Sequence, residues 1–173
     1  MIKNLIIAAA MLACAPAVAE ARDFYGVVRA GITTDTSVGP IDLSDGDTYG
    51  IGVGTSVGPV RVEASLDHSS WDVFPGVSAN ANTVAVTGNL DFQVTHDSSI
   101  SIGAGPAYTD AEANFVFGSF DDSGWGYVAQ ASYSRRLTSN IIGEVQARYT
   151  DVSFDSLPDA NSTAVTVGLR FGL

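Results

Sequence analysis

The sequence predicts an all-β fold, an eight-stranded antiparallel up-and-down transmembrane β-barrel. Three observations predict it. Eight segments alternate between apolar and small or polar side chains, long and short connections alternate between these segments, and the chain ends on an apolar position. A strand side chain changes face at every residue, so this alternation gives each segment one apolar and one polar face.

The last segment shows the pattern most clearly. Residues 162–173 read S-T-A-V-T-V-G-L-R-F-G-L, with an apolar side chain at every second position from Val165 to Leu173. An exposed apolar edge strand of this kind in a soluble protein is prone to aggregation. In a closed barrel within a membrane, lipid covers the apolar face and both neighbouring strands take up the backbone hydrogen bonds.

Seven earlier segments follow the same alternation. They are residues 24–33, 49–57, 60–66, 84–94, 100–105, 125–134 and 141–150. The connections at 34–48, 67–83, 110–124 and 151–161 are long, and those at 56–59, 96–99 and 135–140 are short. This order is typical of outer-membrane barrels with long outer loops and tight periplasmic turns. We therefore predict a multi-pass β-barrel in the cell outer membrane of a Gram-negative bacterium.

The N-terminal residues 1–21 have the features of a signal peptide, which leaves residues 22–173 as the outer-membrane barrel domain. Lys3 precedes a short apolar run, and small residues offer cleavage sites after Ala19 or Ala21. The apolar run is too short to span a bilayer.

The predicted mature chain is acidic and has no cysteine. Cys14, the one cysteine, lies in the segment to be removed, and its surroundings loosely resemble a lipoprotein box, so lipidation is an alternative. Lys3 is the only lysine, so seven arginines face nineteen acidic residues and the net charge is −12. This charge argues against nucleic acid as a partner, because phosphates require a basic surface.

Seven charged side chains fall on the polar face of the predicted strands. They are Arg29, Arg61, Glu63, Asp91, Glu144, Arg148 and Arg170. A barrel of eight strands is just wide enough for its own side chains to fill it, and unpaired charges are costly there. We predict an interior ion-pair network that plugs the lumen. The alternative is a charged path through the barrel, which would make the protein a small porin-like channel.

The long connections are rich in acidic residues and contain no lysine or arginine. The thirteen acids are Asp35, Asp42, Asp45, Asp47, Asp67, Asp72, Asp110, Glu112, Asp121, Asp122, Asp151, Asp155 and Asp159. We predict a solvated acidic rim that acts as an interaction surface. Divalent cations, including ions that bridge to lipopolysaccharide phosphates, are candidate partners there. No metal site and no cofactor is predicted.

One short motif suggests catalysis. His68 and Ser70 form an H-x-S pair at the outer end of the third predicted strand. The pair resembles the His and Ser of outer-membrane lipid A deacylase barrels of the PagL type, in which His acts as base for a Ser nucleophile. That family also needs an orienting carboxylate in the following strand, where this chain offers only Asp91. We therefore predict no enzyme and keep a lipid A-modifying enzyme as an alternative.

Aromatic residues recur near the predicted strand ends, as the two membrane interfaces favour. They are Phe24, Tyr25, Tyr49, Phe92, Tyr108, Trp125, Tyr127, Tyr149 and Phe171. A soluble lipocalin-like barrel with the opposite face inward is the alternative architecture, because strand patterns do not state which face points inward.

The sixth and seventh predicted strands resemble a known family. G-W-G-Y-V-A-Q-A-S-Y at 124–133, R-L-T-S-N at 136–140 and E-V-Q-A-R-Y-T-D at 144–151 are similar to the opacity and surface-antigen, porin-like group of OmpA/OmpX-type barrels. The resemblance implies a non-enzymatic outer-membrane surface protein of structural or adhesive type. It also implies contact with outer-membrane lipid and lipopolysaccharide, and assembly by the barrel-assembly machinery through the C-terminal strand, although Leu173 stands where Phe is usual.

Overall fold

The computed structural model describes residues 23–43, 45–74, 77–115, 118–156 and 158–173. Within them the chain forms the strands β1 (Asp23–Val38), β2 (Ile41–Leu43), β3 (Gly46–Val57), β4 (Val60–Phe74), β5 (Val77–Thr95), β6 (Ser98–Phe115), β7 (Gly118–Arg136), β8 (Ile141–Phe154) and β9 (Ala160–Gly172). The predicted signal peptide, with Lys3, Cys14 and both cleavage sites, lies outside the described residues. In the described part of the chain, no helix is long and apolar enough to span a membrane.

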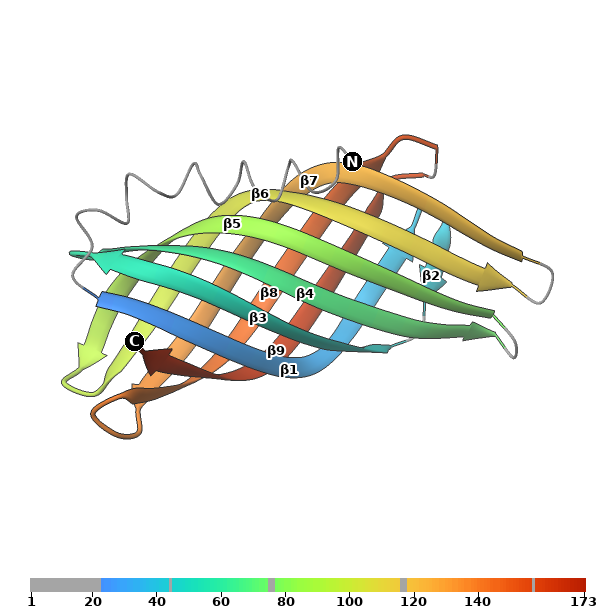
Figure 1. The fold of residues 1–173 in the computed structure, drawn as a ribbon. Helices are drawn as coiled ribbons and strands as arrows, with labels where there is room; N and C mark the ends of the chain where they lie inside the picture. Colours follow the sequence, from blue (N-terminus) through green and yellow to red (C-terminus); the bar gives the residue numbers. More distant parts are fainter. Residues whose placement is uncertain (1–22, 44, 75–76, 116–117, 157) are drawn as a thin grey trace.

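Eight long strands form a closed antiparallel barrel, which confirms the predicted fold class. Each strand from β3 to β9 pairs with its neighbours in chain order, and β9 pairs with β1 to close the ring. The short strand β2 pairs only with the outer end of β1. Figure 1 shows that β1 begins at the end of the barrel where the C-terminus lies. The short turns between β3 and β4, β5 and β6, and β7 and β8 share this end, the predicted periplasmic side.

The strands are longer than the sequence pattern predicts, so the prediction of four long loops is wrong. Strands β5 and β7 contain 19 residues each, and β6 contains 18. The prediction ended each strand where apolar alternation stopped, but backbone pairing continues beyond the apolar region, for example from Asp110 opposite Ser123 to Phe115 opposite Gly118. A membrane-spanning strand needs only about 9–11 residues. The remainder forms a wall beyond the membrane, and most of the predicted loop acids lie on it.

The outer face of the barrel is apolar and the lumen is polar, so the lipocalin-like alternative is wrong. Large apolar side chains are exposed along every long strand, including Ile51, Val53 and Val167, which are each about 60% exposed. Towards the outer end this band carries Tyr49, Trp125, Tyr127 and Tyr149, and towards the other end it carries Phe24, Phe92 and Tyr133. Such a band, with aromatic residues at both edges, is what a lipid-embedded barrel presents.

Tyr25 does not belong to this aromatic band, and its assignment to the interface is wrong. Its side chain points into the lumen and is 5% exposed. Gly54 on the inner face of β3 leaves room for this side chain, because a Cβ there would overlap the Tyr25 ring. Gly50 does the same for Asp67, since a Cβ at Gly50 would overlap its carboxylate. The alternate glycines of β3 therefore allow large polar side chains from the neighbouring strands to enter the lumen.

A bulge at the outer end of β1 changes which residues face inward. The β1–β9 register shifts between Thr34 and Ser37, and Asp35 adopts a positive φ of 55°. Asp is among the few non-glycine residues that tolerate this left-handed conformation. Because of the inserted residue, the next inward-facing side chain after Thr33 is Thr36, three positions later instead of two. Both of these side chains are buried.

Candidate functional site: the lumen of the barrel

The centre of the lumen is organised around the carboxylate of Glu63 on β4. Arg29 of β1 donates to Glu63 Oε1, and the Tyr25 hydroxyl donates to Oε2 at 3.0 Å. Arg61 Nη1 lies 3.5 Å from the same Oε2. Both guanidinium groups and the carboxylate are almost fully buried. A buried carboxylate is stable when cationic donors surround it in this way.

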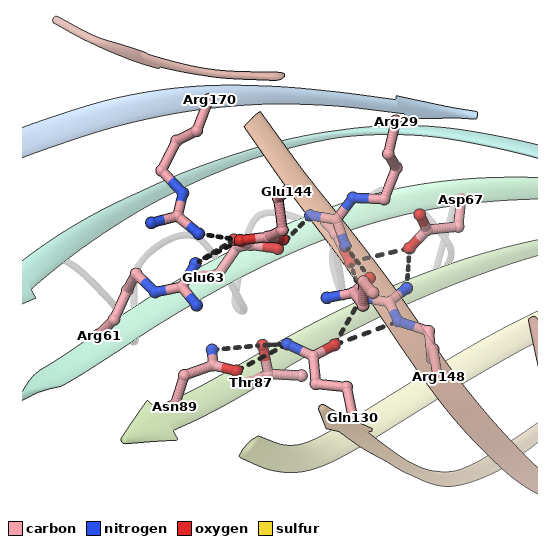
Figure 2. A network of polar contacts seen from close by, with 12 residues as sticks. Arg29, Arg61, Glu63, Asp67, Thr87, Asn89, Gln130, Glu144, Arg148 and Arg170 are labelled. Atoms are coloured by element: carbon pink, nitrogen blue, oxygen red, sulfur yellow. Dashed lines mark hydrogen bonds and ion pairs between the residues drawn. The ribbon is translucent and has the colours of Figure 1, made fainter. Parts of the chain in front are cut away.

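A second carboxylate, Glu144 on β8, extends the network across the lumen (Figure 2). Arg170 of β9 donates to Glu144, and Arg61 lies 3.7 Å from it. Arg61 also lies 3.3 Å from Asp91 on β5, whose side chain is 29% exposed. Arg61 therefore contacts carboxylates from three strands, which draws opposite walls of the barrel together.

Tyr25 fills the space between two of these arginines. The Arg170 guanidinium lies 5.0 Å from the centre of the Tyr25 ring, and that of Arg61 lies 5.7 Å from it. A cation within about 6 Å of an aromatic ring is attracted to its face. The ring thus separates two like charges while it stabilises both.

A further cluster lies nearer the outer end and surrounds Arg148 on β8. Arg148 donates to Asp67, to Ser65 at 3.2 Å, and twice to Gln130 Oε1 at 3.1 and 3.2 Å. Gln130 in turn donates to Asn89 at 2.7 Å (Figure 2). These hydrogen bonds join side chains from four strands, β4, β5, β7 and β8.

Gln146 is a neutral member of the cluster around Glu63. Arg29 donates to Gln146 Oε1 at 2.9 Å while its other terminal nitrogen contacts Glu63. The cluster around Glu63 holds three arginines, Arg29, Arg61 and Arg170, and three carboxylates, Glu63, Asp91 and Glu144, while the outer cluster pairs Arg148 with Asp67. The formal charge of each cluster is therefore balanced, as a buried ionic cluster requires.

The structure places all seven predicted interior charges in these two clusters, six of them buried and Asp91 at the edge of the cluster around Glu63. The sequence reasoning missed Asp67 because it ended the strand at Leu66 and counted Asp67 as a loop acid. Asp67 continues the inward register of Arg61, Glu63 and Ser65, which is the signal that could have found it. Gln130 and Gln146 were on the predicted inner face, but neutral side chains were not counted as network members.

The H-x-S pair lies outside the lumen. His68 packs against the Tyr49 ring at 4.9 Å, and its Nδ1 donates to Asn82 Oδ1 on β5 at 2.8 Å. Among the described residues, no hydrogen bond joins Ser70 to His68. Asp91, the carboxylate considered for the third role, contacts Arg61 inside the barrel instead.

The acidic residues surround the outer end. Eleven of the thirteen predicted loop acids are at least partly exposed there, whereas Asp67 points inward and Asp42 has no described side chain. Across the described ranges, no group of three or more His, Cys, Asp or Glu side chains could hold a metal ion.

A closed eight-stranded barrel with an apolar exterior and a charged lumen defines a transmembrane β-barrel of the outer membrane. The family model of the outer membrane protein beta-barrel domain matches residues 5–171, and the chain belongs to this family.

Solved structures show the same fold. The chain is similar to Neisserial surface protein A, with a TM-score of 0.75, 14% identity, and 86% of this chain and 96% of that chain covered. It is also similar to Ail, the attachment invasion locus protein of Yersinia pestis, with a TM-score of 0.57, 12% identity and coverage of 86% and 99%. The N-terminal barrel domain of Pseudomonas aeruginosa OprF is similar with a TM-score of 0.55 and 14% identity, and the match covers 85% of this chain and 97% of that chain. No curated protein matches the sequence.

Proposed function

We propose that the protein is a non-enzymatic surface protein of structural or adhesive type, with a lumen closed to solutes and an acidic outer end that binds cationic partners. The observation that carries the proposal is the balanced network across the lumen. Four buried arginines occupy the space inside a barrel that is narrow to begin with. The alternative of a small porin-like channel would need a continuous water path through these ion pairs.

Electrical recording in a planar bilayer tests whether the lumen is closed. We expect the reconstituted barrel to produce no steady single-channel current at neutral pH, because paired side chains exclude a column of water. A large water-filled porin inserted in the same bilayer is the positive control. Discrete, reproducible current steps from the purified barrel would favour the channel instead.

The acidic outer end supports an interaction role. Glu112 on β6 lies directly opposite Asp121 on β7, and both side chains are exposed. Like charges in this position destabilise strand pairing, so the arrangement has a cost that a binding function would explain. Ail has been crystallised with the heparin analogue sucrose octasulfate. The acidic surface of this chain is negatively charged, so it would repel such a polyanion and favours cationic ligands.

Binding of a lysine-rich peptide to the barrel in nanodiscs tests this part of the proposal. We expect binding at low salt that weakens as salt screens it, and no binding of a sulfated polysaccharide. The double variant Glu112→Gln/Asp121→Asn should weaken peptide binding severalfold. The matched control is Asp97→Asn, which neutralises an exposed acid at the opposite end of the barrel. Equal loss in both variants would contradict a localised acidic site.

The remaining partners belong to the same proposal. Outer-membrane lipid would cover the apolar band, and divalent cations would bridge the acidic rim to lipopolysaccharide phosphates. The alternating apolar face of β9 would present the assembly signal to the barrel-assembly machinery. The non-enzymatic assignment is supported by Ser70, which lacks the hydrogen bond to His68 that activates a serine nucleophile.

A further inference from the structure

Two arginines of the described chain lie outside the lumen clusters. Of the six arginines in this part of the chain, four form the ion pairs of the lumen. The other two, Arg135 and Arg136, are adjacent at the end of β7, and both are exposed. This is the end of the barrel where the C-terminus and the short turns lie (Figure 1). The acidic rim and these two cations therefore occupy opposite ends of the molecule.

The two arginines lie on opposite faces of the same strand. Ser132 and Ser134 of β7 face the lumen and are buried, whereas Tyr133 between them is 47% exposed on the lipid-facing band. Because strand side chains alternate, Arg135 continues the face of Tyr133, and Arg136 continues the face of the two serines. Arg135 therefore emerges at the edge of the lipid-facing surface, and Arg136 emerges at the opening of the lumen.

The surface next to Arg135 is apolar. Tyr133 lies opposite Ile100 on β6 and Val145 on β8, and all three side chains are about half exposed. Strand residues two positions apart are separated by about 6–7 Å, so the side chain of Arg135 starts at the boundary of the apolar band. A long cationic side chain at such a boundary keeps its stem on apolar surface and extends its charged head to the membrane interface.

Neither arginine has an anionic partner in the described chain. The ion pairs among the described residues all lie in the lumen. Asp97 lies beside the end of β7, since its carbonyl oxygen accepts the backbone N–H of Arg136 at 2.8 Å. Its carboxylate nevertheless forms no ion pair with a described arginine. Arg135 therefore presents unpaired guanidinium donors at the edge of the apolar band.

This position fits the phosphate of a membrane lipid. A guanidinium offers its donors in a planar fork, which can bind two phosphate oxygens at once. A glycerophospholipid carries its phosphate directly above its acyl chains, so one molecule would meet both Arg135 and the apolar surface beside it. A tyrosine at the level of the headgroups, such as Tyr133, is typical of this interface. A soluble anion would gain only the contact with the guanidinium.

We propose that Arg135 binds the phosphate of a glycerophospholipid in the periplasmic leaflet and favours an anionic headgroup, while Tyr133 and its apolar neighbours contact the acyl chains. A zwitterionic headgroup brings an ammonium group that competes with the arginine for the phosphate, and phosphatidylglycerol brings none. The inference rests on the proposed function, in which outer-membrane lipid covers the apolar band. It adds the headgroup that the barrel selects at this edge.

Native mass spectrometry tests the proposal on barrel released from micelles that contain equal amounts of phosphatidylglycerol and phosphatidylcholine. We expect the natural chain to retain phosphatidylglycerol severalfold more than phosphatidylcholine. Arg135→Gln should abolish this preference, and Arg135→Lys should keep part of it, because lysine retains the charge without the planar fork. An excess of soluble glycerol phosphate should not displace the lipid, since it has no acyl chains to contact the band.

Arg136→Gln is the matched control. It removes the same charge from the neighbouring position on the opposite face of β7, so it should retain most of the preference. Both arginines are exposed and outside the lumen clusters, and both variants should therefore fold. A heat-dependent shift in gel mobility verifies the folded barrel in each case.

Three results would overturn the proposal. They are a preference that survives Arg135→Gln, an equal loss in Arg135→Gln and Arg136→Gln, and displacement of the lipid by glycerol phosphate. Retention of both lipids without preference by the natural chain would overturn it as well, but would leave intact the proposal that lipid covers the apolar band. Retention of neither lipid would contradict both.

Discussion

The variant Glu63→Leu is expected to lose about 3–5 kcal/mol of unfolding free energy, or to fail to reach the folded barrel, because it leaves buried cations without their central anion. Glu63 is 1% exposed, contacts Arg29 and Arg61, and accepts a hydrogen bond from Tyr25. Urea-induced unfolding of the barrel in lipid vesicles, followed by tryptophan fluorescence, measures the loss.

A second substitution should restore much of this stability. In Arg29→Met/Glu63→Leu the lumen retains three arginines and three carboxylates, and Arg61 keeps its contacts with Asp91 and Glu144. Replacing a buried ion pair by apolar side chains is often neutral or stabilising, so the double variant should be more stable than the single one. Asp91→Asn is the matched control, since this more exposed carboxylate should contribute only about 1 kcal/mol or less. Equal losses in Glu63→Leu and Asp91→Asn would contradict a central role for Glu63.

The fold and the interior charges were predictable because the face to which a strand side chain points depends only on its position in its own strand. Arg61 and Glu63 alternate with apolar neighbours, so their shared face follows from position alone. In a lipid-embedded barrel the apolar face meets lipid, and the remaining face must point inward. That argument holds for every strand without knowledge of its partners.

The contacts between those charges were not predictable, because they depend on register between strands that are far apart in sequence. Arg148 meets Asp67 across 81 positions of the chain, and His68 meets Asn82 only because the β4–β5 hairpin extends well beyond the apolar band. The alternation of apolar side chains ends at the membrane boundary, whereas backbone pairing between the strands continues beyond it. The positive φ at Asp35 changes the inward register by one residue, and alternation alone carries no sign of it.

The variant Gly105→Val is expected to prevent assembly of the barrel or to cost about 3 kcal/mol or more, because its side chain has no room between two strands. A Cβ at Gly105 on β6 would overlap the carbonyl oxygen of Val86 on β5. The pairing of β5 with β6 has a gap at this point: Ala85 lies opposite Ala107 and Gly88 opposite Ala104, and the residues between them are not paired. Pro106, which has no N–H to donate, lies in the same gap.

The matched control is Gly88→Val on the adjacent strand. Gly88 faces outward, is exposed, and a Cβ there would meet nothing within 4 Å. A valine on this lipid-facing strand position should fold as well as the natural chain or better. Gel mobility with and without heating, after refolding into vesicles, should show the compact form for Gly88→Val and its loss for Gly105→Val. Comparable yields of folded barrel from both variants would mean that β5 and β6 can separate at this level without cost, which the closed hydrogen-bond ring argues against.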